Sequence, residues 1–165
     1  MLIIYSVLIV KANTKRLKIR PLFVSQMFTS HTINSCKKML HDYGEFNNFV
    51  DRVLAIMEDE VNDESDKVEQ KDKEAYENIK ATRSELESVY KELKITIAAR
   101  DNEKTMKNLT NTLNLLEKLK EEFEKMAEGG PGELFFNLGI NYLHSTIKRI
   151  VSKTFRKTRD EIVRL

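Results

Sequence analysis

The fold of this chain is decided by residues 75–127, which read AYENIKATRSELESVYKELKITIAARDNEKTMKNLTNTLNLLEKLKEEFEKMA. Their apolar residues recur at spacings of three and four, which is typical of helices with one buried face. The stretch lies within 84 residues, Glu45 to Glu128, that contain neither glycine nor proline. Nothing there forces a helix to stop, and the abundance of Glu, Lys, Leu and Ala favours helix. The sequence therefore predicts an all-α protein.

Two apolar stripes in this stretch point in different directions. They consist of Ile79, Leu86, Val89, Tyr90, Leu93 and Ile97, and of Met106, Leu109, Leu113, Leu116 and Phe123. On a helical wheel the leucines of the second stripe lie roughly 120–180° from Leu86. We therefore predict a turn near Ala99–Glu103, with Asp101 or Asn102 capping the second helix. The result is an antiparallel helical hairpin over residues 75–127, and the alternative is one long rod with two partners.

Two further helices are expected on either side of the hairpin. One apolar stripe consists of Phe46, Phe49, Val50, Val53, Leu54, Met57 and Val61. It predicts a helix that begins near Glu45, just after Gly44, and breaks near Asn62–Ser65. The glycines and proline of residues 129–132 end the hairpin and start a last helix over residues 133–163.

Residues 13–165 are predicted to form a single all-helical domain, an elongated helical bundle with the charged antiparallel hairpin at its centre. Residues 13–44 are a basic entry segment, residues 45–128 the charged helices, and residues 133–163 a basic amphipathic C-terminal helix. The same stripes would also suit pairing between chains as a coiled coil, so a homodimer is an alternative.

Charge and composition exclude several classes of protein. The net charge is +5 over residues 1–57, −7 over residues 58–128 and +4 over residues 129–165. The overall charge of +2 argues against a uniformly basic nucleic-acid binder. Five glycines and two prolines are too few for the turns of an all-β fold.

Residues 1–12 have two interpretations, a short signal peptide or an apolar N-terminal segment. The run Leu2–Val10 would span only about 14 Å as a helix, half of a bilayer core. Val10 and Ala12 fit a signal cleavage site, although no basic residue precedes the apolar run. The protein is accordingly secreted under the first interpretation, or cytoplasmic under the second.

The candidate site is the basic face of the C-terminal helix. It consists of Lys148, Arg149, Lys153, Arg156, Lys157 and Arg159, with no acidic residue between them. These side chains lie opposite the apolar side of the helix, except for Lys157 at the border. One interpretation is a solvated face whose charges are offset by Glu121, Glu122 and Glu124 of the hairpin, and the other is a binding surface. We favour the first.

Motifs for catalysis and for metal binding are missing from the sequence. No acidic residue stands three positions before His31, His41 or His144, as a di-iron bundle requires. Phosphate-loop and nucleophile-elbow motifs are also missing. Cys36, the single cysteine, is interpreted as a small buried side chain, and Asn108 belongs to a glycosylation sequon that matters only in a secreted protein. We expect no enzyme, no cofactor and no metal.

The leading functional hypothesis is a non-catalytic helical interaction protein that binds another macromolecule, with a protein partner or a homodimer as its ligand. The second is a peripheral membrane or lipid-binding protein that applies the helix 134–159 to an anionic surface. The third is nucleic-acid binding through two basic ends, Lys15–Arg20 and Lys148–Arg159.

Overall fold

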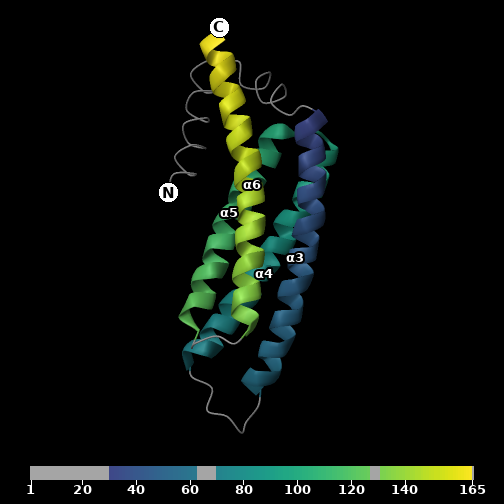
Figure 1. Ribbon diagram of the computed structural model, residues 1–165. Coiled ribbons are helices and arrows are strands. Elements are labelled where there is room, and N and C mark those ends of the chain that lie inside the picture. Colours follow the sequence, from purple (N-terminus) through teal and green to yellow (C-terminus); the bar gives the residue numbers. More distant parts are fainter. Residues whose placement is uncertain (1–29, 63–69, 127–130, 165) are drawn as a thin grey trace.

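The protein is an up-and-down bundle of antiparallel helices (Figure 1). The structure, a computed structural model, describes residues 30–62, 70–126 and 131–164. Its elements are α3 (Ser30–Asn62), α4 (Gln70–Ala98), α5 (Asn102–Lys125) and α6 (Pro131–Arg164). Nearly all described residues are helical and none of them lies in a strand, so the predicted all-α fold is confirmed.

Each helix packs against two neighbours. α4 contacts α3 and α5, while α6 contacts α5 and α3, so the four helices close into a ring around one core. Because successive helices reverse direction, the first and last described helices lie side by side (Figure 1). This arrangement is the usual topology of helical bundles with short connections.

The turn between α4 and α5 matches the sequence prediction. Arg100 N–H donates to the carbonyl of Ile97 (3.1 Å), and Asp101 N–H donates to the carbonyl of Thr96 (2.9 Å). With Arg100 at a φ of 53°, these two bonds form the Schellman motif that closes a helix C-terminus. The Asp101 carboxylate then accepts a hydrogen bond from Lys104 N–H (3.2 Å) as the N-cap of α5. Residues 75–127 therefore do not form one long rod.

The predicted start of the first long helix near Glu45 is wrong. α3 begins at Ser30 and passes through Gly44 without interruption. A glycine costs a helix about 0.5–1 kcal/mol relative to alanine. Here it allows a close contact, because an added Cβ on Gly44 would lie 2.9 Å from Tyr90 Oη. Gly44 is thus a packing site for Tyr90, not a helix breaker.

The second half of the segment interpreted as a basic entry, residues 13–44, also belongs to the bundle. Cys36, Met39 and Tyr43 are fully buried and continue the apolar stripe of α3 towards its N-terminus. The other end of α3, at Asn62, agrees with the predicted break near Asn62–Ser65.

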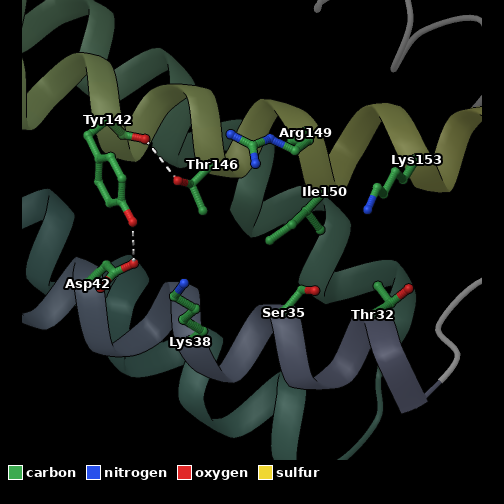
Figure 2. A pocket seen from close by; sticks show the side chains of 9 residues that line it. All are labelled: Thr32, Ser35, Lys38, Asp42, Tyr142, Thr146, Arg149, Ile150 and Lys153. Atoms are coloured by element: carbon green, nitrogen blue, oxygen red, sulfur yellow. Dashed lines mark hydrogen bonds between the residues drawn. The ribbon is translucent and has the colours of Figure 1, made fainter.

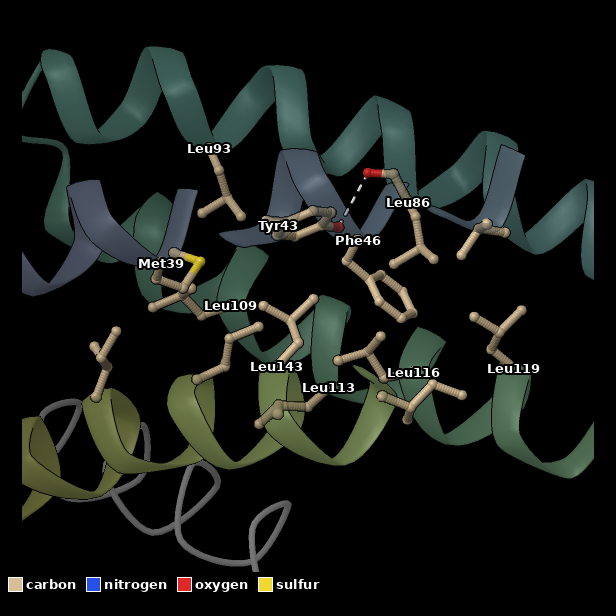
Figure 3. Close-up of a cluster of buried hydrophobic side chains, with 14 of the residues drawn as sticks. Met39, Tyr43, Phe46, Leu86, Leu93, Leu109, Leu113, Leu116, Leu119 and Leu143 are labelled. Carbon is tan, nitrogen blue, oxygen red and sulfur yellow. Dashed lines mark hydrogen bonds between the residues drawn. The ribbon is translucent and has the colours of Figure 1, made fainter. Parts of the chain in front are cut away.

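The core is built mainly from leucine and other aliphatic side chains of all four helices (Figure 3). Its largest fully buried members are Met39, Tyr43, Ile79, Leu86, Leu93, Leu109, Leu113, Leu116, Leu119 and Ile140. Burying these one-sided stripes against one another supplies most of the stability that such helices have. The stripes that were expected to pair either within a chain or between chains are thus buried within one chain.

α6 is longer than its partners at one end of the bundle. It begins at Pro131, where a missing backbone N–H is harmless in the first turn of a helix. Thr32 and Lys153 line the same groove, so α3 starts roughly level with residue 155. From there α6 continues to Arg164, about 14 Å further. Its last two turns therefore extend beyond the start of α3 (Figure 1).

The predictions for residues 1–12 and for residues 13–29 lie outside the described residues. Within the described part of the chain, none of the helices is long and apolar enough to cross a membrane.

Candidate functional site

α3 and α6 together form the face of the bundle that carries the candidate site. A groove of about 240 Å³, here called the basic groove, runs between the two helices (Figure 2). It is lined by Thr32, Ser35, Lys38 and Asp42 of α3 and by Tyr142, Thr146, Arg149, Ile150 and Lys153 of α6. The groove exists because Thr32, Ser35 and Thr146, which are shorter than most core residues, occupy positions along the helix boundary.

Three cationic side chains line the basic groove. In Figure 2, Lys38 extends from α3 towards α6, Lys153 extends from α6 towards α3, and Arg149 lies between Thr146 and Lys153. All three are exposed, and none has an ion-pair partner among the described residues. Arg149 and Lys153 are also four residues apart on one helix, a spacing at which like charges repel.

Arg83 on α4 provides a contrast, because it is a cation that stabilises the fold through ion pairs and a hydrogen bond. It pairs with Asp51 (2.8 Å) and Glu87 (2.9 Å). Its Nε also donates to the carbonyl of Asn47 (3.1 Å). Burial alone would lower the pKa of Arg83, but the bonds to the two carboxylates raise it above its ordinary value. Within the part of the chain that the structure describes, Arg149 has no ion-pair partner.

A second groove continues the first along the same face. This apolar groove, of about 390 Å³, is lined by Asp42, Glu45, Phe46, Phe49, Arg52, Gly139, Tyr142 and Leu143. Asp42 and Tyr142 line both grooves, and Tyr142 donates its hydroxyl to the Asp42 carboxylate (3.4 Å). Tyr142 is 57% exposed, as is Leu138 one helical turn earlier. The face therefore has a basic half and an apolar half, with the Asp42–Tyr142 pair at their boundary.

The structure separates the six predicted site residues into three groups. Arg149 and Lys153 line the basic groove. Lys148 is exposed but does not line it. Arg156, Lys157 and Arg159 belong to the part of α6 that extends beyond the start of α3, and their side chains lie outside what the structure describes.

The expected neutralisation by Glu121, Glu122 and Glu124 is wrong. His144 and Glu117 lie side by side (3.5 Å), so antiparallel packing sets Glu121 level with Ile140. That level is about 12 Å along the helix from Lys148.

Two of these acids have partners on their own hairpin instead. Glu122 accepts hydrogen bonds from Asn78 (3.2 Å) and Lys125 (2.8 Å), and Glu124 pairs with Lys120 (4.0 Å). Burial alone would raise the pKa of Glu122, but the bonds from Lys125 and Asn78 lower it.

Sequence reasoning missed the α3 side of the site. Lys38, Thr32 and Ser35 were included in the basic entry segment and were not connected with the C-terminal helix. The available signal was the apolar repeat through Cys36 and Met39, which extends the first helix to the level of Lys153. In an up-and-down bundle of four helices the first and last are neighbours, so this extension places Lys38 on the same groove as Arg149 and Lys153.

Several other sequence features are buried. Cys36 is 0% exposed, as the sequence predicted, and burial raises the pKa of its thiol to about 11. Asn108 is 4% exposed within α5, so the folded chain does not present its glycosylation sequon. Among the residues that the structure describes, no three His, Cys, Asp or Glu side chains are grouped closely enough to hold a metal ion.

Comparisons with known proteins add no relative. No family model matches the chain, and no curated protein and no solved structure matches it.

Proposed function

We propose that this protein is a non-catalytic helical interaction protein and that it binds another protein through the α3/α6 face. The observation that carries the proposal is the continuity of the basic and apolar grooves across the Asp42–Tyr142 pair. Protein-binding surfaces combine exposed aromatic and arginine side chains with a polar rim. Tyr142 and Arg149 supply these two residue types on one helix.

The expected partner is a protein segment with acidic or otherwise anionic groups near one large apolar side chain. The anionic groups would face Lys38, Arg149 and Lys153, and the apolar side chain would enter the groove next to Phe46 and Phe49. Complementary charge of this kind mainly directs association and fixes the register of the partner.

A membrane surface is a weaker candidate for the same face. The apolar side of α6, which an interfacial helix would insert into lipid, is buried in the bundle at Ile140, Leu143 and Ile147. The large apolar side chains of α6 that remain exposed to a bilayer are Leu138 and Tyr142. A nucleic acid would present a row of phosphates, whereas only three of the described cations line this groove.

Photo-crosslinking tests the proposed surface. Benzoylphenylalanine is introduced at Leu138 in one variant and at Ile95 in another, since Ile95 is 68% exposed but belongs to α4. Both variants are illuminated in native extract, and the crosslinked species are identified by mass spectrometry. We expect a protein that is captured from position 138 and not from position 95.

The captured protein is then purified and its affinity measured. Tyr142→Ala should weaken binding about tenfold or more, the range of a central aromatic contact, while Ile95→Ala should leave it unchanged. Equal capture from both positions, or equal affinity of both alanine variants, would contradict the proposal.

A further inference from the structure

We infer that the basic groove is a binding site for a single phosphate group, carried by a phosphorylated side chain of the partner protein. The inference rests on the proposed function, because it takes the α3/α6 face as the surface that meets the partner. It adds the chemistry of the group that the partner presents.

Positive charge exceeds negative charge in the basic groove. Three cations line it, Lys38, Arg149 and Lys153, against one carboxylate, Asp42. That carboxylate lies at the boundary with the apolar groove and accepts a hydrogen bond from Tyr142 (3.4 Å). The region between Thr32 and Thr146 is therefore positive, and a dianion would relieve the repulsion between Arg149 and Lys153.

The hydrogen-bond donors of the basic groove are of the types that bind phosphate. An arginine offers a planar fork that matches two oxygens of a phosphate, and lysines add point charges around it. Lys38 comes from the opposite helix, so the groove can contact an anion from two sides (Figure 2). Cations on both walls distinguish this groove from a basic stripe along one helix.

The basic groove is small. A groove of about 240 Å³ lies below the range of roughly 300–1,000 Å³ that drug-sized ligands occupy. It suits one small polyatomic group. The apolar groove begins directly beyond Tyr142, so the rest of a peptide has a surface on which to continue. This continuity favours a phosphorylated protein segment over a free ion.

Titration with soluble phosphomonoesters tests the site without any partner. The whole chain, labelled with nitrogen-15, is titrated with O-phosphoserine, and serine at matched ionic strength serves as the blank. We expect amide shifts at Thr32, Ser35 and Thr146 with phosphoserine only. Shifts that serine reproduces, or none at these residues, would overturn the inference.

Two matched variants separate a built site from diffuse charge. Lys38→Gln/Arg149→Gln/Lys153→Gln removes the cations of the groove, while Lys37→Gln/Lys73→Gln/Lys107→Gln removes as many exposed charges elsewhere. The first should weaken binding about tenfold or more, and the second less than about twofold. Equal weakening in both would overturn the inference. Arg149→Lys keeps the charge but loses the fork, so it should also weaken binding severalfold.

Two further arms distinguish the source of the phosphate. Vesicles of phosphatidylcholine with and without a phosphoinositide, and a short DNA duplex, are tested for binding that the groove variant loses. Vesicle or duplex binding in the absence of phosphoserine binding would replace the phosphorylated protein by a membrane or a nucleic acid. Failure of all arms overturns the phosphate site but leaves crosslinking from Leu138 free to succeed, so the two proposals fail separately.

Discussion

Tyr43 is a polar residue at the centre of an apolar core. Its hydroxyl donates to the carbonyl of Leu86 (3.0 Å) and lies 3.3 Å from Thr112 Oγ1. Thr112 in turn donates its hydroxyl to the carbonyl of Asn108 (3.0 Å). The hydroxyls of Tyr43 and Thr112 thus make three contacts, which connect α3, α4 and α5. The ring of Tyr43 also packs against Tyr90, with centroids 5.1 Å apart.

Tyr43→Phe keeps this ring packing and removes only the hydroxyl. We expect the free energy of unfolding to fall by about 1–2 kcal/mol, because a buried hydrogen bond is lost and Thr112 loses a neighbour. The matched control is Tyr142→Phe, whose hydroxyl bond to Asp42 is exposed and should matter by less than about 0.5 kcal/mol. Urea unfolding measures both, and equal losses would contradict the role given to Tyr43.

Gly44 and Gly139 both lie within helices, but only one of them is in a place where a larger side chain would collide with a neighbour. An added Cβ on Gly139 would make an ordinary contact with the Phe46 ring at 3.5 Å. An added Cβ on Gly44 would meet Tyr90 Oη at 2.9 Å. Only the glycine of α3 is required by packing.

Gly139→Ala should therefore stabilise the bundle by about 0.5–1 kcal/mol, the helix propensity gained over glycine. Gly44→Ala gains the same propensity but must displace Tyr90, so it should be less stable than Gly139→Ala by about 1 kcal/mol or more. Thermal and urea unfolding of the two variants give the comparison. A gain from Gly44→Ala as large as that from Gly139→Ala would refute the packing role.

The elements differ in how much the sequence reveals. The turn at Arg100 and the cap at Asp101 were predictable because the two stripes of the hairpin lie on different faces, a local signal. The start of α3 was not predicted, because Gly44 resembles a breaker when the Tyr90 contact is unknown. In the candidate site, Arg149 and Lys153 could be predicted from the amphipathic pattern of the C-terminal helix alone. Lys38 could be assigned to the site only once α3 was known to pack against α6, and no local spacing in the sequence encodes that pairing.

Part of the acidic middle segment lies at the end of the described bundle that is remote from the basic groove. The net charge of the acidic middle comes mostly from residues 58–69, which contain seven acidic residues and one lysine. Of these, Glu58, Asp59 and Glu60 lie at the end of α3 remote from Lys153. The α4–α5 hairpin contains as many cations as acids and pairs several of them locally, as at Lys118–Glu85 (3.6 Å). The basic groove is thus remote from these three acids.

Stability of the whole bundle should fall in alkali. Burial raises the pKa of Cys36 from 9.0 to about 11, and burial also raises the pKa of Tyr43. Both groups are neutral in the folded core, and they ionise more easily once unfolded. The stabilising contribution of Cys36 is therefore complete below about pH 8 and is lost as the pH rises through about 9 to 11. That of Tyr43 begins to be lost only near pH 10, the ordinary pKa of its hydroxyl.

We expect the free energy of unfolding to drop by about 1–2 kcal/mol between pH 8 and pH 10, as measured by urea unfolding at each pH. Cys36→Ala is less stable at every pH, but its decline over this interval should be smaller, because only Tyr43 still resists ionisation. An equal decline in both proteins would contradict the assignment to Cys36.

The antiparallel order of the four described helices also determines how the bundle resists a pulling force. The start of α3 and the last turns of α6 lie at the same end of the described bundle as the α4–α5 turn, with α6 extending beyond it (Figure 1). Tension applied between them acts across the helix axes, not along them. Such a force separates α3 from α6 turn by turn, starting at the basic groove, instead of sliding whole helices past each other at once. Tension would therefore first separate the α3/α6 interface, where we expect a partner to bind. A bound partner that contacts both helices would resist this separation.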